Sequence, residues 1–600
     1  MSPDVVLREA ERLLRAGDAL GAERTLATLW SDTAHAPAAV LHLLGLIRRG
    51  QKRIPESERY FRRAIAAEPS APQYHFALAE VLASVGAHSH AAAAFAETLR
   101  LDPKFPRVRA LYTQSAFAAG MLTEAEHAAR PLVEGEPTAD NWDLLSRILR
   151  AQDKLDEALG AADAALTVNP RHTPAAHGRA ATLARLGRNE EALAVLDALN
   201  AQGLEAPALV FTRGNALFNL ARAREAEAAF ADGARRWPQD SGLHNALANA
   251  RWMRGAAGEF SRDFEAAVAR QPDNTQLRLM CADLLRRAEF SQRSEALLRE
   301  GLARQPQDVA LLASLGVLLD EGDRTAEGLP LLQQAAQRAP HLTTIRANLA
   351  CALLRLGRGD EALNEIEPAR RTEPLNQEWI CYETMALRQL GDPRYHAICD
   401  YDRMVRAYDL SPPNGFASMR AFNEALSASL AKLHVLEAHP LDQSLRGGSQ
   451  TSRSLIYVDD PVIQTYLAAL AEPIHAYMAA MGPRDPDHPW SGRNTGKYKL
   501  SGAWSVKLKA NGFHVNHVHP AGWISSAYYV ALPPVMERGE SQQGWIQFGE
   551  PRWPTPGCTA EKAVQPKEGR LVLFPSYMWH GTLPFSAGER LTAPFDAVPV

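Results

Sequence analysis

Apolar and polar residues follow two different periods along the chain. Over roughly the first two thirds, apolar residues recur at spacings of three and four, the period of amphipathic helices. The stretch "LARLGRNEEALAVLDALN" (183–200) shows two such segments joined at Gly187. From about residue 497 the period becomes two, as in "AWSVKLK" (503–509), which is typical of strands with one buried face. The pattern predicts a helical N-terminal part and a β-rich C-terminal part.

The helical part is an internal repeat, in which prolines recur at an almost constant interval and one proline is missing near position 204. Gly or Asp stands midway between most successive prolines, where it tolerates a chain reversal between two helices. An alanine often follows the reversal and lets the helix backbones approach closely, and the proline ends the second helix. The prolines are Pro69, Pro103, Pro137, Pro170, Pro238, Pro272, Pro306, Pro340 and Pro374, and the alanines are Ala91, Ala125, Ala158, Ala192, Ala226 and Ala362.

This unit resembles the tetratricopeptide repeat, and the resemblance covers roughly residues 35–374 in about ten copies. It implies a right-handed superhelix of helix pairs, an α-solenoid, with a concave groove that binds peptides or proteins. A passive spacer or an oligomerisation arm is the alternative, because the repeats carry no chemistry of their own.

The C-terminal part contains several expected elements. Helices are expected within residues 416–436 and 460–481, and strands within 524–532, 544–549, 569–575 and 590–598. Asn511-Gly512 is expected to form a tight hairpin turn, so that residues 513–519 return as a strand. Short strands between Gly, Pro and polar loops predict a β-sandwich or barrel. The expected domains are therefore residues 1–395 and 396–600.

The candidate chemistry lies in "NHVHP" (516–520). Residues two apart on an extended strand point to the same side, so His517 and His519 could bind one metal ion together. No carboxylate lies near them in the sequence. His580 lies well downstream of this pair, and Arg590 and Thr592 come shortly after it.

These landmarks resemble the Fe(II)/2-oxoglutarate-dependent oxygenases, whose pattern is His-x-Asp/Glu, a distal His, and Arg-x-Ser/Thr a short way on. The stretches "QSLRGGSQT", "HVHPAGWISSAYYV" and "GRLVLFPSYMWHGT" are similar to a bacterial and phage subgroup of these oxygenases. Some members of that subgroup are fused to tetratricopeptide repeats. The likeness runs from about residue 396 to the C-terminus, and it implies a double-stranded β-helix (jelly-roll) domain with supporting helices.

The resemblance also implies roles for the site residues. His517 and His580 would be the constant Fe(II) ligands. Arg590 would hold the distal carboxylate of the co-substrate 2-oxoglutarate through two charge-assisted hydrogen bonds, and Thr592 could add a hydroxyl contact. Position 519 departs from the pattern, because His519 stands where most of the family has a carboxylate. His519 either completes a three-histidine face or points away and leaves the third position to water.

Charge and composition exclude several classes. A net charge of −4, without a long basic run, argues against a nucleic-acid partner. Polar residues near the N-terminus do not fit a signal peptide, and no apolar run is long enough to cross a membrane. The five cysteines show no CxxC spacing, which favours reduced thiols and a cytoplasmic protein.

The sequence therefore predicts a dioxygenase that uses Fe(II), 2-oxoglutarate and O2 to hydroxylate a protein or peptide side chain recruited by the repeat groove. A non-catalytic repeat scaffold, or a small-molecule oxygenase that uses the repeats for assembly, is the alternative. A cupin dioxygenase would need Glu shortly after the second histidine, where residues 520–524 read "PAGWI". A hydrolytic zinc site would need a general base beside the motif. The oligomeric state stays open.

Overall fold

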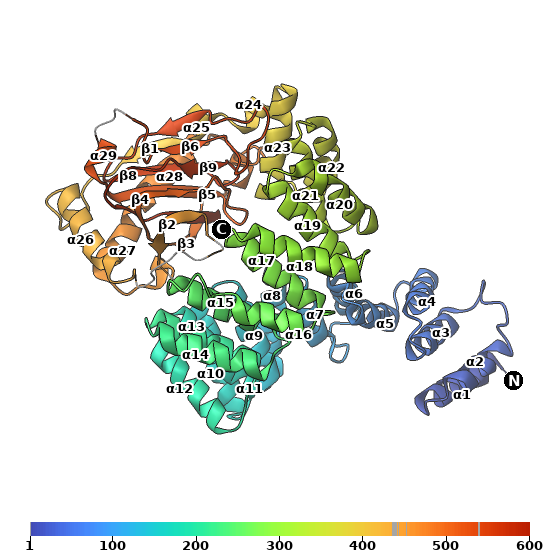
Figure 1. The fold of residues 1–600 in the computed structure, drawn as a ribbon. Coiled ribbons are helices and arrows are strands. Elements are labelled where there is room, and N and C mark those ends of the chain that lie inside the picture. The colour runs from blue at the N-terminus through green and yellow to red at the C-terminus, as the bar shows by residue number, and fades with distance from the viewer. Residues whose placement is uncertain (1, 435–440, 442, 452, 538–540) are drawn as a thin grey trace. The chain divides into compact units, whose positions relative to one another are not determined.

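The computed structural model describes residues 2–434, 441, 443–451, 453–537 and 541–600. The chain divides into two compact units, Met1–Leu204 and Glu205–Val600. Figure 1 labels most of the elements of both units. Each unit is described below by itself.

The first unit consists of helices in which each packs against the next along the chain. Among the described residues of the whole chain, no helix is both long and apolar enough to cross a membrane. The helices of the first unit are α1 (Pro3–Arg15), α2 (Ala19–Ala27), α3 (Ala38–Gly50), α4 (Ile54–Ala67), α5 (Pro72–Ser84), α6 (His88–Leu101), α7 (Val108–Ala118), α8 (Leu122–Gly135), α9 (Ala139–Ala151), α10 (Leu155–Val168), α11 (Thr173–Arg185) and α12 (Asn189–Ala201).

The second unit continues the helical array and then becomes β-rich. Its array helices are α13 (Pro207–Asn219), α14 (Ala223–Arg236), α15 (Ser241–Met253), α16 (Arg262–Arg270), α17 (Thr275–Arg287), α18 (Ser291–Arg304), α19 (Val309–Glu321), α20 (Thr325–Arg338), α21 (Thr343–Arg355), α22 (Gly359–Thr372) and α23 (Gln377–Leu390). The α-solenoid expected from the regular recurrence of proline is confirmed.

A left-handed backbone conformation marks the turn inside each helix pair. It recurs at the same place in successive repeats, at Lys52, Gly86, Gly120, Asp153, Gly187, Ala221, Gly255, Glu289, Asp323 and Gly357. Gly and Asp reach this conformation most easily, which explains the sequence signal. Lys52, Ala221 and Glu289 adopt it against their steric preference. The geometry of the helix pair therefore decides the backbone at this position, whatever the residue.

The six alanines of the repeat signature are fully buried, each with 0% of its surface exposed. In other repeats a serine or glycine occupies the position of this alanine. The serine hydroxyls form hydrogen bonds to the backbone of the paired helix. The Ser57 hydroxyl donates to the carbonyl of Gly45 at 2.8 Å, and Ser294 donates to Ala282 at 2.7 Å. A Cβ added at Gly328 would lie 2.5 Å from the Gly316 carbonyl oxygen. The backbones of paired helices are thus too close for a larger side chain.

The β domain begins after α23 and carries its own helices. The helices are α24 (Arg394–Ile398), α25 (Tyr401–Met404), α26 (Met419–Ala431), α27 (Pro461–Ala469), α28 (Ala471–Ala480) and α29 (Pro534–Glu537), with short 3-10 turns at Leu455–Tyr457 and Ser491–Arg493. The strands are β1 (Arg406–Asp409), β2 (Leu445–Gln450), β3 (Tyr498–Ala503), β4 (Val506–His514), β5 (Ile524–Ala531), β6 (Ile546–Phe548), β7 (Lys562–Val564), β8 (Arg570–Pro575), β9 (His580–Thr582), β10 (Arg590–Thr592) and β11 (Phe595–Pro599).

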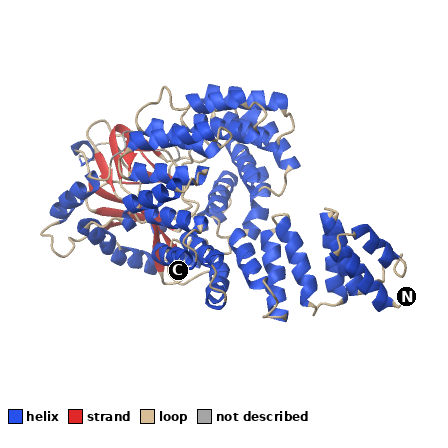
Figure 2. Ribbon diagram, turned by 90° about the horizontal axis from the view of Figure 1, so that it is seen from below, coloured by secondary structure: helices blue, strands red, loops and turns tan. Residues whose placement is uncertain are grey.

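The strands form two antiparallel sheets within the described part of the chain. The larger has the order β1-β8-β5-β10-β4-β2, with β11 paired to both β3 and β5, and the smaller has the order β7-β6-β9. The sheets pack together through aromatic residues, since the ring centroids of Phe548 on β6 and Phe574 on β8 are 5.0 Å apart. Figure 2 shows the strands gathered in one region and flanked by helices. This is the jelly-roll domain with supporting helices that the sequence predicts.

The last repeat helix shares a core with the β domain. Ile380 and Leu387 on α23 belong to the same buried cluster as the strand residues. Arg388 forms a 2.8 Å ion pair with Glu561 and donates to the Gly549 carbonyl at 2.9 Å. Packing therefore joins the repeat array of the second unit to the domain that holds the candidate site.

Two strand predictions are wrong. Asn511-Gly512 forms no hairpin turn, because β4 runs through it and pairs with β2 across an irregularity beside Gly447. Asn511 has the positive φ that such a turn requires, but this conformation serves equally in a bulged strand. The predicted strand 590–598 is two strands, β10 and β11, separated by Ala593 and Pro594. Proline lacks the N–H donor that a continuous ladder needs.

The close packing inside each pair makes a testable prediction in α12. Ala192 is fully buried and Ala194 is exposed on the same helix. Ala192→Leu should lower the free energy of unfolding by ~1–3 kcal/mol, because the paired backbones must move apart. Ala194→Leu should change it by less than about 0.5 kcal/mol. Urea unfolding followed by circular dichroism measures both, and equal effects would contradict the packing argument.

Candidate metal centre

Backbone pairing between two distant segments brings the candidate ligands together. The amide of His517 donates to the carbonyl of His580 at 2.9 Å, and the reverse bond is 3.0 Å. The amide of His519 donates to the Ser576 carbonyl at 2.9 Å. The segment after β4 is thus extended, as an isolated bridge rather than the predicted strand. Its alternation still turns His517 and His519 to the same side.

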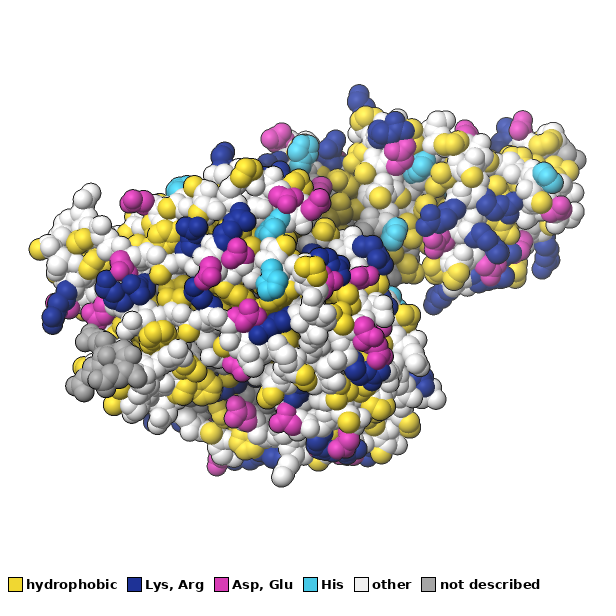
Figure 3. Space-filling model, turned by 90° about the horizontal axis from the view of Figure 1, so that it is seen from above, with side chains coloured by type: hydrophobic (Ala, Val, Ile, Leu, Met, Phe, Trp, Pro, Cys, Tyr) yellow, Lys and Arg dark blue, Asp and Glu magenta, His cyan; other side chains and the backbone are white. Residues whose placement is uncertain are grey.

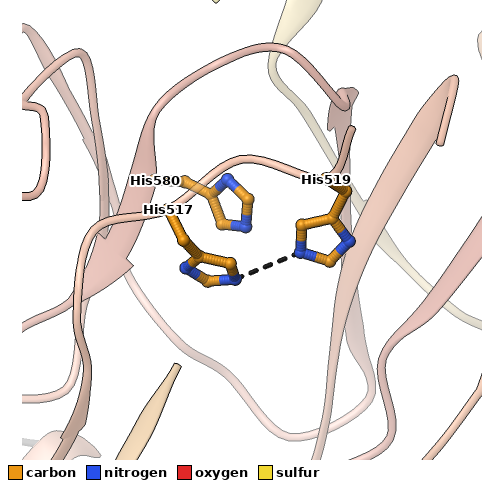
Figure 4. A group of neighbouring side chains, drawn as sticks. All are labelled: His517, His519 and His580. Carbon is orange, nitrogen blue, oxygen red and sulfur yellow. Dashed lines mark hydrogen bonds between the residues drawn. The ribbon is translucent and has the colours of Figure 1, made fainter. Parts of the chain in front are cut away.

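The three imidazoles converge (Figure 4). One ring nitrogen from each of His517, His519 and His580 lies within 4.8 Å of the others, so the group could hold a metal ion. His517 Nδ1 contacts the Val515 carbonyl and His580 Nδ1 contacts the Met578 carbonyl, both at 2.9 Å. A carbonyl only accepts, so each Nδ1 carries the proton and each Nε2 presents a lone pair.

His519 is oriented by a carboxylate from another strand. Its Nδ1 lies 2.6 Å and 2.8 Å from the two carboxylate oxygens of Asp596 on β11. The Ser525 hydroxyl donates to the same carboxylate at 2.7 Å. Nδ1 of His519 is therefore protonated, and its Nε2 lies 3.1 Å from His517 Nε2. Either a second proton on His519 or a metal ion between the two nitrogens satisfies this short contact.

Electrostatics keeps His517 and His580 neutral. Burial and the nearby His519 lower the pKa of His517 to about 3, and burial lowers the pKa of His580 well below its ordinary value. Burial alone would lower the pKa of His519, but the charge and hydrogen bond of Asp596 raise it above its ordinary value. Neutral imidazole is the form that binds a metal. Asp596 supplies the negative charge that a carboxylate at position 519 would have brought.

A second feature of the site is an unpaired buried cation. Arg590 on β10 is 2% exposed, and its Nη1 donates to the Gly544 carbonyl at 3.2 Å. Its Nε and the Tyr529 hydroxyl are buried and have no hydrogen-bond partner among the described residues. Burial lowers the pKa of Arg590, and Tyr529 opposes that shift. A buried guanidinium without a carboxylate is costly, so this end of the site fits an anionic ligand.

One cavity of about 480 Å³ connects the two features. The three histidines, Arg590 and Thr592 all line it. Thr592 is buried, with its hydroxyl 3.5 Å from the Val506 carbonyl. The volume lies in the range of sites that hold small ligands.

Residues beside the ligands complete the inner wall. The indole of Trp504 stacks on His519 with ring centroids 6.0 Å apart. The Ser444 hydroxyl lies 2.9 Å from His514 Nδ1 and 3.3 Å from His517 Nε2. His514 ends β4 and stacks beside His517, so it adjoins the group without joining it.

The structure brings together every residue that the sequence singled out, and it adds Asp596, Tyr529 and Ser444. Asp596 comes 77 residues after His519, and no motif spacing marks it. Tyr529 is buried, and it lines the same cavity as Arg590.

Two kinds of family model match separate parts of the chain. Residues 502–596 match the family described as "Putative 2OG-Fe(II) oxygenase". Residues 42–106, 144–203 and 318–380 match models described as "Tetratricopeptide repeat". The resemblances seen in the sequence are thereby confirmed for both parts.

Solved structures of other repeat proteins are similar to part of this chain. A tetratricopeptide repeat protein from Parabacteroides merdae is 16% identical, with 41% of this chain and 96% of that chain covered and a TM-score of 0.32. A thermophilic TPR protein from Thermus thermophilus is 24% identical, with 30% of this chain and 98% of that chain covered and a TM-score of 0.26. No curated protein sequence matches the chain.

The convergence of lone pairs predicts metal binding by the full-length protein. Co(II) added to the metal-free protein should bind with a visible absorption band, and His517→Ala or His580→Ala should abolish that band. His519→Ala tests the third ligand, because loss of binding indicates three histidines and retention indicates water. His90→Ala, at an exposed histidine of α6, is the matched control. Unchanged bands in both His517→Ala and His580→Ala would show that the site is misplaced.

The contact between His519 and Asp596 makes a separate prediction. Asp596→Ala should weaken Co(II) binding about 10–100-fold, the usual cost of losing a group that orients a ligand histidine. Asp596→Asn should retain part of the affinity, since an amide oxygen can still accept from Nδ1 but carries no charge. Ser525→Ala, which leaves the carboxylate in place, should have a smaller effect. Calorimetric titration measures all three, and wild-type affinity in Asp596→Ala would contradict the role of this carboxylate.

Proposed function

We propose that this chain is an Fe(II)- and 2-oxoglutarate-dependent dioxygenase that hydroxylates a protein or peptide side chain. One observation carries the proposal. A group of three histidines that could hold a metal and an unpaired buried Arg590 line the same cavity, within a region that matches the oxygenase family.

The donor set fits the iron that the family implies. His517, His519 and His580 would hold the ion from one side, and imidazole is a good ligand for Fe(II). Bound iron would let O2 oxidise 2-oxoglutarate to succinate and carbon dioxide, while the second oxygen atom enters a C–H bond of the substrate.

Arg590 would bind the distal carboxylate of 2-oxoglutarate. Its free Nε and the free Tyr529 hydroxyl are both donors, and both residues line the cavity. Such an ionic hydrogen bond in a buried site is strong, because water does not compete for it. Thr592 lines the same cavity and would add a hydroxyl contact.

Asp596 would keep the proton on Nδ1 of His519, so that its Nε2 stays available to the metal. The charge of Asp596 would also offset part of the charge of the ion. His517 and His580 depend instead on backbone carbonyls, which hold the same proton position without adding charge.

The repeats would recruit the substrate, with residues 1–395 as the recruiting domain and 396–600 as the catalytic domain. A groove binds an extended chain through many weak contacts, and the tether raises the local concentration of the target side chain. The shared core between α23 and the β domain supports a joint role. Five free cysteines, four of them buried, fit a protein of the reducing cytoplasm.

The proposed function can be tested by measuring the conversion of 2-oxoglutarate to succinate. The iron-loaded full chain should form succinate in air, and His580→Ala should not. Arg590→Ala should raise the KM for 2-oxoglutarate at least tenfold, because the carboxylate loses its ionic partner. Arg590→Lys should restore only part of the affinity, since an ammonium cannot reproduce the planar fork.

Arg570→Ala is the control for the Arg590 variants, since Arg570 pairs with Asp409 and does not line the cavity. Equal KM values for 2-oxoglutarate in all of these proteins would rule out the assignment of Arg590. Succinate formation that persists in His580→Ala would rule out the metal site as the catalytic centre. The hydroxylated product should be heavier by one oxygen atom in mass spectrometry.

A further inference from the structure

The cavity carries a second set of cationic residues besides Arg590. Arg286 and Arg287 at the end of α17, Arg446 on β2, and Arg552 in the segment after β6 all line it. These arginines are called the arginine wall below. Among the described lining residues only Asp596 is acidic, and it is engaged by His519 and Ser525. The described lining residues therefore offer no free carboxylate to these guanidinium groups.

Arg552 has no ionic partner. Its side chain lies over the Trp553 ring, 4.8 Å from the centroid, and no carboxylate of the described residues forms an ion pair with it. The residue is exposed, so the wall reaches solvent. Partial burial of its guanidinium and the charges of Arg446 and Arg286 lower the pKa of Arg552, although the charges of two glutamates act in the opposite direction.

The other arginines are only partly neutralised. Arg446 pairs with Glu289 at 3.1 Å, but the Glu289 side chain is 74% exposed, and such pairs contribute little. Arg287 pairs with Asp283, yet its Nε is buried without a hydrogen-bond partner among the described residues. Arg286 is well paired, with Glu321 and Asp283. Arg552 and Arg287 thus keep donor groups that could bind an anion, and the ion pair of Arg446 is weak.

This charge is local. The whole chain carries a net charge of −4. On the face seen in Figure 3, basic and acidic side chains are intermixed. The grouping of four arginines around one cavity is therefore not a reflection of the overall charge of the chain.

We propose that the arginine wall binds an acidic side chain of the peptide substrate, close to the residue that is hydroxylated. This rests on the proposed function for its peptide substrate. A peptide fits better than a free anion, because the wall is built from three separate chain segments and opens to solvent at Arg552. It also gives the repeat array a direct part in the site, since α17 supplies two of the four arginines.

The experiment measures peptide binding to the metal-free full chain, so that its outcome does not depend on catalysis. The probes are a fluorescein-labelled peptide pool rich in Asp and Glu and a matched pool with Asn and Gln instead. Fluorescence anisotropy should show at least tenfold tighter binding of the acidic pool, and added salt should weaken that binding. Arg552→Glu and Arg446→Glu should each reduce the preference for the acidic pool about tenfold.

Arg420→Glu is the matched control, because Arg420 is an exposed arginine on α26 that does not line the cavity. An equal loss in Arg420→Glu, or no preference for the acidic pool in the wild type, would overturn the proposal. Equally tight binding of a single-stranded oligonucleotide, lost in Arg552→Glu, would overturn the assignment to an acidic peptide.

The two proposals fail in different ways. Loss of the acidic preference with intact succinate formation would refute the arginine wall alone. An intact preference in a chain that forms no succinate with iron and 2-oxoglutarate would refute the enzymatic function alone. If both hold, the acidic pool should stimulate succinate formation by the wild type more than by Arg552→Glu.

Discussion

The candidate site depends on the backbone bridge between His517 and His580. Two hydrogen bonds of 2.9 and 3.0 Å join segments that lie far apart in the sequence and bring two imidazoles together. Carbonyls of the same segments then hold the proton on each Nδ1. Without this bridge the nitrogen lone pairs would not converge, and the cavity would have no metal-binding end.

Replacing a carboxylate by His519 does not remove negative charge from the site, because Asp596 lies directly behind that histidine. His519 and Asp596 act together. His519 turns a neutral nitrogen toward the other two histidines, and the Asp596 carboxylate lies against the opposite nitrogen of the same ring. Charge balance around a cation is a constraint on the whole site, so it can be met by a residue that is not itself a ligand. Ser525 and Ser576 extend the same network and hold the carboxylate in place.

Repeat helices of the second unit contribute to the core of the β domain and to the candidate site. Helix α23 packs in the core of the β domain, and α17 lines the cavity that contains the three histidines. The cavity thus has Arg590 buried in the jelly roll and an arginine wall shared with the repeats. These are two distinct cationic regions of one cavity, which is what the proposed binding of 2-oxoglutarate and of an acidic peptide would require.

The sequence by itself determined the α-solenoid and the jelly-roll class, and it singled out the three histidines, Arg590 and Thr592, which the structure places around one cavity. The repeat and His-x-His signals are local, because a helix-pair turn, a buried alanine or an alternation along a strand depends on near neighbours. His580, Arg590 and Thr592 are distant from that pair and were singled out through the family pattern. The hairpin turn predicted at Asn511-Gly512 is wrong, since a positive φ at Asn511 occurs in a bulged strand as well as in a hairpin. Only the tertiary structure decided that Asp596 orients His519 and that α17 reaches the cavity, because both contacts join residues far apart in the chain through strand pairing and domain packing.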